Sequence, residues 1–185
     1  MDDYYEVIDF WFDYLEPRQW FEKNKKIDDK IRDKFLNLYT DITCGRCREW
    51  TKSPKGVLAI IIVLDQFSRN MFRETSKMYS FDMMALNLAK NALEEGFDKE
   101  LTPIERTFLY MPFMHSEDLE DQYRCVILFE KLVNEDEKFE KNLEFAKAHR
   151  DIILKFKRFP HRNEILDRTS TPLEKEFLKQ ENSSF

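Results

Sequence analysis

The sequence predicts an all-α fold of about seven to nine helices. Its 185 residues include only 3 Gly and 6 Pro, where average usage gives about 22 of the two together. Apolar residues recur at three- and four-residue steps, as in the stretch 27–42, which is typical of amphipathic helices. Hydroxyl residues precede prolines at Ser53, Thr102 and Thr171, a pattern that marks helix starts.

These signals place the helices in order along the chain, with Gly96 as the C-terminal cap of the fourth. Thr102 and Thr171 are each followed three residues later by Glu, as in a capping box, and we expect Glu117 and Asp118 in the first turn after Ser116. The expected ranges are about 4–15, 28–41, 54–67, 79–95, 103–110, 117–133, 138–157 and 172–179.

The apolar run Val57–Leu64 is ambiguous, because a buried strand would also be continuously apolar. The Ser53-Pro54 start, the continuation into Asp65 without a turn, and the lack of a second strand to pair with all favour a helix.

We expect a single domain, 1–185, of antiparallel helix pairs stacked in sequence, with 180–185 as a polar tail. The sequence shows no clean internal repeat, so any repeats are degenerate.

Composition excludes several classes of function. The three glycines stand far apart, so neither a P-loop nor a dinucleotide-binding loop can form. A net charge of −6 argues against nucleic-acid binding. No apolar run reaches the roughly 18 residues of a membrane span, the N-terminus lacks the features of a signal peptide, and three cysteines do not make a disulfide framework. We therefore expect a cytoplasmic protein.

Cys44 and Cys47 form a C-x-x-C pair. A structural zinc site needs four ligands, and the α/β context of a redox motif is missing, so we interpret the pair as incidental cysteines at a helix end.

A polar run, Asp65–Arg73, follows the most apolar part of the chain. In a continuing helix, Asp65 and Arg69 lie one turn apart, as do Gln66 and Asn70. This spacing suits an ordinary surface pair, but the neighbouring core equally favours a partly buried polar network.

All three histidines lie in dense polar clusters. A histidine and a carboxylate can share a proton in acid–base catalysis, and arginine can hold a carboxylate or phosphate in a bidentate manner. Neither a metal-binding spacing nor a cofactor motif is present, so we predict no metal and no cofactor. A structural network that locks helix ends and loops together remains the alternative.

Several long motifs occur along the chain: Val7–Phe12, Leu64–Arg73, Pro112–Asp118, His149–Ile153, Arg158–Asn163 and Ser170–Pro172 with Phe177-Leu178. In this order they resemble domain-of-unknown-function family 924, and the likeness runs from about Tyr4 to the end of the chain. The resemblance implies an all-helical, tetratricopeptide-like fold and supplies no activity. The chain departs from the family pattern at three positions. Lys157 stands where we expect a small residue, often Gly, and Asp167 stands where we expect Gly. Ser68 stands where Pro is frequent. The first two bear on the loop around His161, since glycine often marks positive φ.

Our leading hypothesis is that these motif residues converge in one polar pocket that binds a small anionic molecule or a partner peptide. The alternatives are a hydrolase that uses His115 with Glu117 or Asp118, and a scaffold without a ligand; the oligomeric state stays open. The candidate ligand-binding residues are Asp65, Arg69, Asn70, His115, Glu117, Asp118, His149, Arg158, His161, Arg162 and Asn163.

Overall fold

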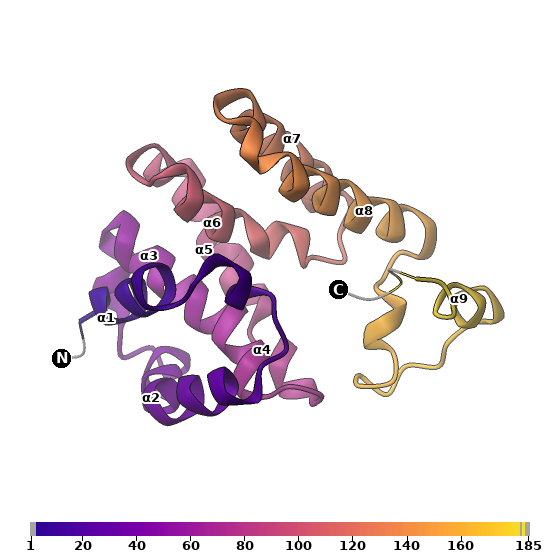
Figure 1. Ribbon diagram of the computed structural model, residues 1–185, viewed down its shortest axis with the longest axis horizontal. Helices are drawn as coiled ribbons and strands as arrows, with labels where there is room; N and C mark the ends of the chain where they lie inside the picture. Colours follow the sequence, from indigo (N-terminus) through magenta and orange to yellow (C-terminus); the bar gives the residue numbers. More distant parts are fainter. Residues whose placement is uncertain (1–2, 182, 184–185) are drawn as a thin grey trace. The chain divides into compact units, whose positions relative to one another are not determined.

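A computed structural model describes residues 3–181 and 183, and within this part of the chain every regular element is helical (Figure 1). The α-helical segments are α1 Tyr5–Asp9, α2 Lys25–Thr43, α3 Pro54–Ile61, α4 Ser68–Met71, α5 Asp82–Glu94, α6 Pro103–Met114, α7 Leu119–Glu135, α8 Glu140–Phe156 and α9 Pro172–Phe177. Short 3-10 segments lie at Pro17–Trp20, Arg48–Lys52, Ser76–Tyr79, Phe97–Glu100, Glu137–Phe139 and Pro160–Arg162.

The apolar run Val57–Leu64 is helical, as expected, but its second half is not α-helical. Ile62–Phe67 is a π-helical segment that joins α3 to α4, so that 54–71 is one continuous helix. A second π-helical segment, Phe10–Tyr14, extends α1. The sequence analysis did not predict either π segment.

Local capping explains the helix ends that were predicted correctly. Ser53 Oγ accepts a hydrogen bond from the Gly56 N–H at 3.2 Å, and Thr171 forms a complete capping box with Glu174. Gly96 follows the end of α5 with φ +75°, which only glycine adopts without strain.

Several details of the expected boundaries were wrong. The helices expected to end near 67 and 110 continue to Met71 and Met114, because their buried apolar residues continue that far, and the helix expected to start near 79 begins at Asp82. The second helix begins at Lys25, not near 28, because the Asn24 side chain caps it by accepting from the Lys26 N–H. Glu117 and Asp118 do not lie in a first turn: Asp118 is the N-cap of α7 and accepts from the Glu120 and Asp121 N–H groups.

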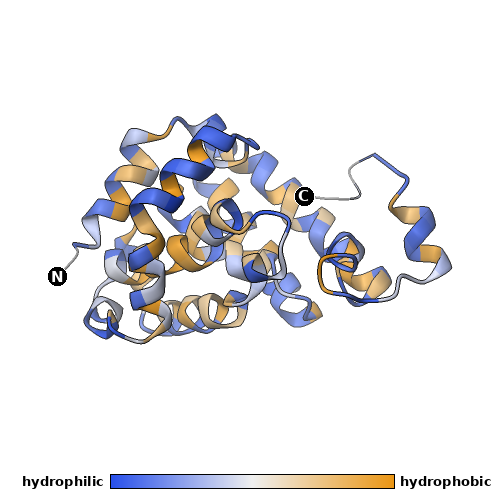
Figure 2. Cartoon of the chain, turned by 90° about the horizontal axis from the view of Figure 1, so that it is seen from below, coloured by the Kyte–Doolittle hydropathy of each residue, from blue (hydrophilic) through white to orange (hydrophobic). Residues whose placement is uncertain are grey.

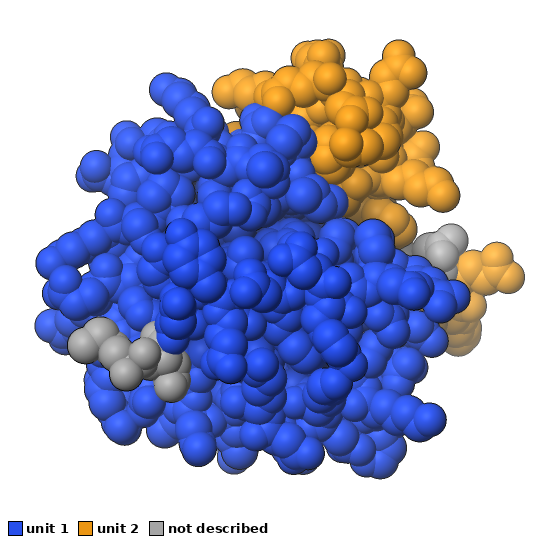
Figure 3. All heavy atoms as spheres, turned by 60° about the vertical axis from the view of Figure 1, so that its left-hand side comes forward, with its two compact units in different colours: residues 1–73, 77–112 blue, residues 74–76, 113–185 orange. Residues whose placement is uncertain are grey.

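The chain divides into two compact units, coloured separately in Figure 3. Unit 1 comprises the residues up to Arg73 and Lys77–Pro112, and unit 2 comprises Glu74–Ser76 and the residues from Phe113 onward.

Aromatic rings form the centre of unit 1. Trp11 packs edge-on against Phe67 and Phe108, with ring centroids 5.5 and 5.4 Å apart, and Phe35 lies 4.7 Å from Phe67. All four side chains are buried. This packing fixes the 54–71 helix and the π segment of α1 against each other.

Unit 2 is built on α7 and α8, which lie side by side as an antiparallel pair joined by Glu137–Phe139 (Figure 1). Helices of the chain carry both hydrophilic and hydrophobic residues along their length, as Figure 2 shows, which is typical of amphipathic helices. A buried apolar cluster in this unit consists of Ile152, Ile153 and Phe159. Phe156 and Phe177 of α9 pack against it, and their ring centroids lie 5.0 Å apart.

Two sequence predictions reach the edge of what is described. Of the expected polar tail, 182, 184 and 185 lie outside the described residues, while Gln180 and Glu181 are exposed and Ser183 is buried. No helix of the described chain combines the length and hydropathy of a membrane span.

Candidate functional site

The predicted site residues fall into two groups, one in each unit. Asp65, Arg69 and Asn70 belong to unit 1. The other eight belong to unit 2 and are His115, Glu117, Asp118, His149, Arg158, His161, Arg162 and Asn163. Because the two groups belong to different units, the convergence of all eleven residues in one pocket stays a prediction.

In unit 1, Arg69 is the centre of a buried ionic network. It donates two parallel hydrogen bonds to Asp82, each 3.0 Å long, and lies 3.4 Å from Asp65, which is fully buried. Burial opposes the charge on Arg69, but the Asp65 and Asp82 carboxylates outweigh it and raise the pKa of the guanidinium. The predicted one-turn pair of Asp65 and Arg69 is therefore present, inside a network.

Asn70 extends this network to α2. Its side-chain amide donates to Asp28 at 2.8 Å, and Arg73 holds the same carboxylate through Nε and Nη2 at 2.8 and 2.7 Å. These contacts connect the end of α4 to α2. They give Asn70 and Arg73, in the second half of the polar run Asp65–Arg73, a structural role.

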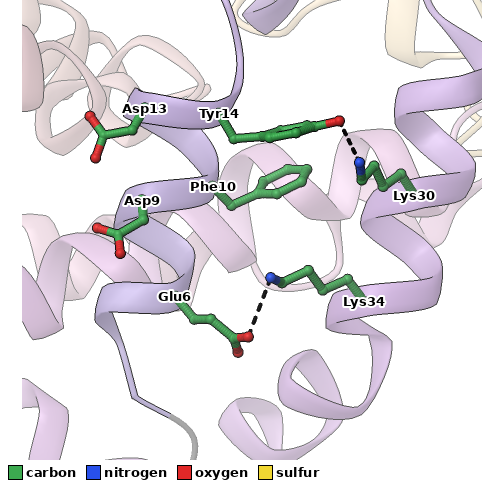
Figure 4. A pocket seen from close by; sticks show the side chains of 7 residues that line it. All are labelled: Glu6, Asp9, Phe10, Asp13, Tyr14, Lys30 and Lys34. Atoms are coloured by element: carbon green, nitrogen blue, oxygen red, sulfur yellow. Dashed lines mark hydrogen bonds and ion pairs between the residues drawn. The ribbon is translucent and has the colours of Figure 1, made fainter.

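Unit 1 also carries an open surface groove of about 510 Å³ that the sequence analysis did not predict (Figure 4). Phe10 and Tyr14 stack at 5.2 Å, and Lys30 lies 4.0 Å from the Tyr14 ring centroid. Lys34 pairs with Glu6 at 3.3 Å. These stacked rings and their lysine partners pack the π segment onto α2, and no predicted site residue lines the groove.

In unit 2 the three imidazoles gather around Phe159, and we call His115, His149, His161, Phe159 and Arg162 the histidine cluster. The His115 and His149 ring centroids are 6.3 Å apart. The rings of His149 and His161 each lie 5.6 Å from the Phe159 ring, which is fully buried. The cluster therefore assembles residues of α8, of the segment between α6 and α7, and of the 3-10 turn after α8.

Arg162 is held rigidly in this cluster. Its guanidinium lies 4.5 Å from the centroid of the Phe159 ring, and its Nη2 donates to the His115 carbonyl at 3.0 Å. Only 7% of the residue is exposed. A buried guanidinium held on both sides places a fixed positive charge among the imidazoles.

His149 is held in one tautomer. Its Nδ1 lies 2.7 Å from the Phe145 carbonyl, and because a carbonyl only accepts, Nδ1 carries the hydrogen and Nε2 is the acceptor nitrogen. Burial, reinforced by His115 and Arg162, lowers the pKa of His149 to about 3. The ring is therefore neutral at physiological pH.

His161 responds to the same surroundings. Burial is the largest cause, followed by Arg162 and His115, and together they lower the pKa of His161 to about 4, although Glu117 acts in the opposite direction. His115 and His161 both act on His149, and His115 acts on His161, so the three rings share one electrostatic environment.

Glu117 fastens the loop that carries His161. Its carboxylate accepts two hydrogen bonds from Arg168, at 2.7 and 3.0 Å, and one from the Phe159 N–H at 2.8 Å. Burial opposes ionisation of Glu117, but these bonds outweigh it and lower its pKa. Glu117 therefore positions the cluster from outside through Arg168 and the backbone of Phe159.

A second clamp joins Arg158 to Glu174 of α9. The guanidinium donates to both carboxylate oxygens, at 2.6 and 2.7 Å, and also to the Thr169 carbonyl at 2.9 Å. Asn163 is 1% exposed and donates to Ser170 Oγ at 3.0 Å. Arg158 and Asn163 thus brace the loop.

Comparison with known proteins agrees with the motifs. The profile of a family described as bacterial protein of unknown function, DUF924, matches residues 7–182. The chain belongs to the DUF924 family. It is also similar to a solved structure of a protein of unknown function from Agrobacterium tumefaciens: 35% identity, a TM-score of 0.88, and coverage of 95% of this chain and 96% of the other. No curated protein matches the chain.

This DUF924 chain places non-glycine residues in left-handed backbone at the two positions where we expected glycine in the family pattern. Lys157 has φ +61° directly after α8, and Asp167 has φ +53° beside Arg168. Both residues border the loop that carries His161. The loop therefore adopts positive φ despite the lack of glycine, at a cost in backbone energy.

Sequence reasoning missed the residues that hold the DUF924 site together. Arg168 and Glu174 supply the partners of the two clamps, and Phe159 supplies the surface on which the cluster packs. Phe159 lies inside a motif stretch and Glu174 in the predicted capping box of Thr171, but no local pattern links Arg168 or Glu174 to its ionic partner, which is distant in the chain. Within the described residues, no three His, Cys, Asp or Glu side chains are grouped to hold a metal ion.

The C-x-x-C pair lies where a helix ends, as expected. Cys44 is the C-cap of α2 and is exposed, and Cys47, which directly precedes the 3-10 segment Arg48–Lys52, is half-buried.

Proposed function

We propose that this DUF924 chain binds a small anionic ligand, either a free metabolite or the acidic group of a partner peptide, at the histidine cluster. The observation that carries the proposal is the positive field of Arg162. It lowers the pKa of His149, His161 and Glu117 alike, and an anion beside them would be stabilised by the same field.

Preorganisation supports the proposal. The loop that presents His161 and Arg162 is fixed at its two ends by the Glu117–Arg168 and Arg158–Glu174 clamps. A loop held in this way loses little further conformational entropy when a ligand binds. The strained backbone at Lys157 and Asp167 is also of a kind that clusters at functional sites.

The hydrolase alternative receives less support from the same geometry. It requires a carboxylate that works with His115, but Glu117 is fixed by Arg168 and Asp118 caps α7. We therefore propose binding without catalysis. The cytoplasmic location and the tetratricopeptide-like classification stay predictions.

Calorimetric titration with inorganic phosphate tests the proposal. We expect saturable binding that Arg162→Gln weakens at least tenfold, because charge-assisted hydrogen bonds contribute about 1.5–3 kcal/mol. Arg150→Gln is the matched control, since Arg150 lies in α8 and pairs with the exposed Asp151. Circular dichroism verifies that both variants fold.

Equal phosphate binding by the wild type and Arg162→Gln would place the anion elsewhere. If neither phosphate nor a carboxylate such as citrate binds, the scaffold alternative holds.

A further inference from the structure

We propose that the histidine cluster binds an oxyanion together with one proton, and that His161 takes up this proton. The inference rests on the proposed anion binding and adds its regulation: binding strengthens as the solution becomes more acidic.

The first step is the state of the rings before binding. His149 is 5% exposed and His161 is partly buried, so water cannot stabilise a charge on either. Arg162 adds a positive charge beside them, held at 4.5 Å from the Phe159 ring on which both imidazoles pack. Without a ligand both rings are therefore neutral at pH 5, a pH at which an imidazole in water carries a positive charge.

The second step is the effect of the anion. A unit charge about 6 Å from an imidazole, at an effective dielectric constant of about 20, changes the proton affinity of the ring roughly a hundredfold. The negative charge of an oxyanion at the cluster opposes the positive field of Arg162. An imidazole therefore binds a proton more tightly when the anion is bound, and the anion binds more tightly when the imidazole is protonated.

Of His149 and His161, the second ring takes up a proton more readily. His149 already uses Nδ1 for the Phe145 carbonyl and is the more deeply buried of the two rings that carry shifted pKa values. His161 lies within the field of the Glu117 carboxylate, which favours its charged form. His161 therefore gains a proton at the lower cost.

Burial is the strongest influence against a proton on His161, and Arg162, His115 and Arg168 oppose protonation as well. Glu117 favours protonation. In the free protein the opposing influences together outweigh Glu117, and the pKa of His161 is about 4. A bound anion favours protonation, as Glu117 does.

The direction of the pH dependence follows. Below about pH 4 His161 is protonated with or without the anion, so affinity no longer depends on its proton. Above that pH, and up to the raised pKa of the complex, each unit of acidification increases affinity up to tenfold. At higher pH the dependence disappears again.

The test is calorimetric titration of the full chain with sodium sulfate, which stays fully ionised, so any proton taken up belongs to the protein. Measurements at about pH 5 in pyridine and in piperazine, which both buffer there and differ in ionisation enthalpy, give the number of protons. We expect 0.5 to 1 proton per sulfate, roughly, and an affinity at about pH 5 several times that at about pH 6.

The variants assign the proton. We expect His161→Gln to bind sulfate without proton uptake, and Arg150→Gln, which lies outside the histidine cluster, to retain it. Unchanged uptake in His161→Gln overturns the assignment. If His161→Gln does not fold, the His161 Cε1–H resonance of the wild type replaces it: sulfate must raise the pKa read from that signal, and an unmoved pKa refutes the inference.

The failure of this inference differs from failure of the proposed function. Sulfate that binds with no proton uptake and a flat pH profile refutes the inference alone. Absence of phosphate, citrate and sulfate binding at every pH refutes both.

Discussion

Replacement of Lys157 by glycine should stabilise the protein. Lys157 is exposed, follows α8, and has φ +61° and ψ 8°. An L-residue in left-handed backbone costs about 1–2 kcal/mol, and the greater freedom of glycine in the unfolded chain offsets roughly 0.5–1 kcal/mol of this. The net gain for Lys157→Gly is therefore up to about 1 kcal/mol, which raises Tm by roughly 2–4 °C in a chain of this size.

Lys155→Gly is the matched control for this prediction. Lys155 is the same residue type, exposed, and two positions earlier in the last turn of α8. Its backbone is right-handed, so glycine there should cost about 1 kcal/mol. Asp167→Gly should stabilise less than Lys157→Gly, because aspartate tolerates left-handed backbone better than lysine.

Urea unfolding followed by circular dichroism measures all three variants on one scale. We expect Lys157→Gly to increase the free energy of unfolding and Lys155→Gly to decrease it. If both variants lose stability to the same extent, the backbone at Lys157 stores no strain, and its departure from the family pattern has no energetic consequence.

Three further results are expected. Unfolding free energy should fall as pH drops from about 6.5 toward 5, by roughly 1 kcal/mol per unit for each of His149 and His161, because the unfolded rings bind protons that the folded rings exclude; a flat profile in urea titrations would contradict this. Phe159→Ala should cost about 3–5 kcal/mol and change the imidazole resonances, since the ring is fully buried beneath the cluster. Arg69→Met should cost about 3–5 kcal/mol by thermal unfolding, because the fully buried Asp65 and the partly buried Asp82 keep their charges without Arg69, and Arg69→Met with Asp82→Asn should recover part of the loss.

Local chemistry made much of the fold predictable. The hydroxyl of Ser53 bonds a backbone group three residues away, and the capping box of Thr171 involves Glu174, so sequence neighbours contain the whole interaction. The helical interpretation of Val57–Leu64 is confirmed for the same reason. The ring centroids of His115 and His149, two of the predicted site residues, lie 6.3 Å apart.

Long-range contacts and helix type were not predictable in this way. Asp28 is held by Arg73, and Glu117 by Arg168, pairs separated by more than 40 residues, and no local pattern records such a partnership. The π segment Ile62–Phe67 escaped because all six of its residues are buried, including the polar Asp65 and Gln66. A segment without a solvent-exposed face carries no phase from which the number of residues per turn can be inferred.

The short helix α9 has a consequence for how this protein opens. Glu174, on a helix of six residues, holds Arg158 at the start of the loop and the amide of Thr171 near its end. Loss of these few bonds opens one of the two clamps on the loop without unpacking α7 from α8, while Glu117 still holds the Phe159 N–H. We therefore expect the amide hydrogen of Thr171 to exchange earlier than that of Phe159 and those inside α7, so that the final helix acts as a latch on one end of the segment that carries His161 and Arg162.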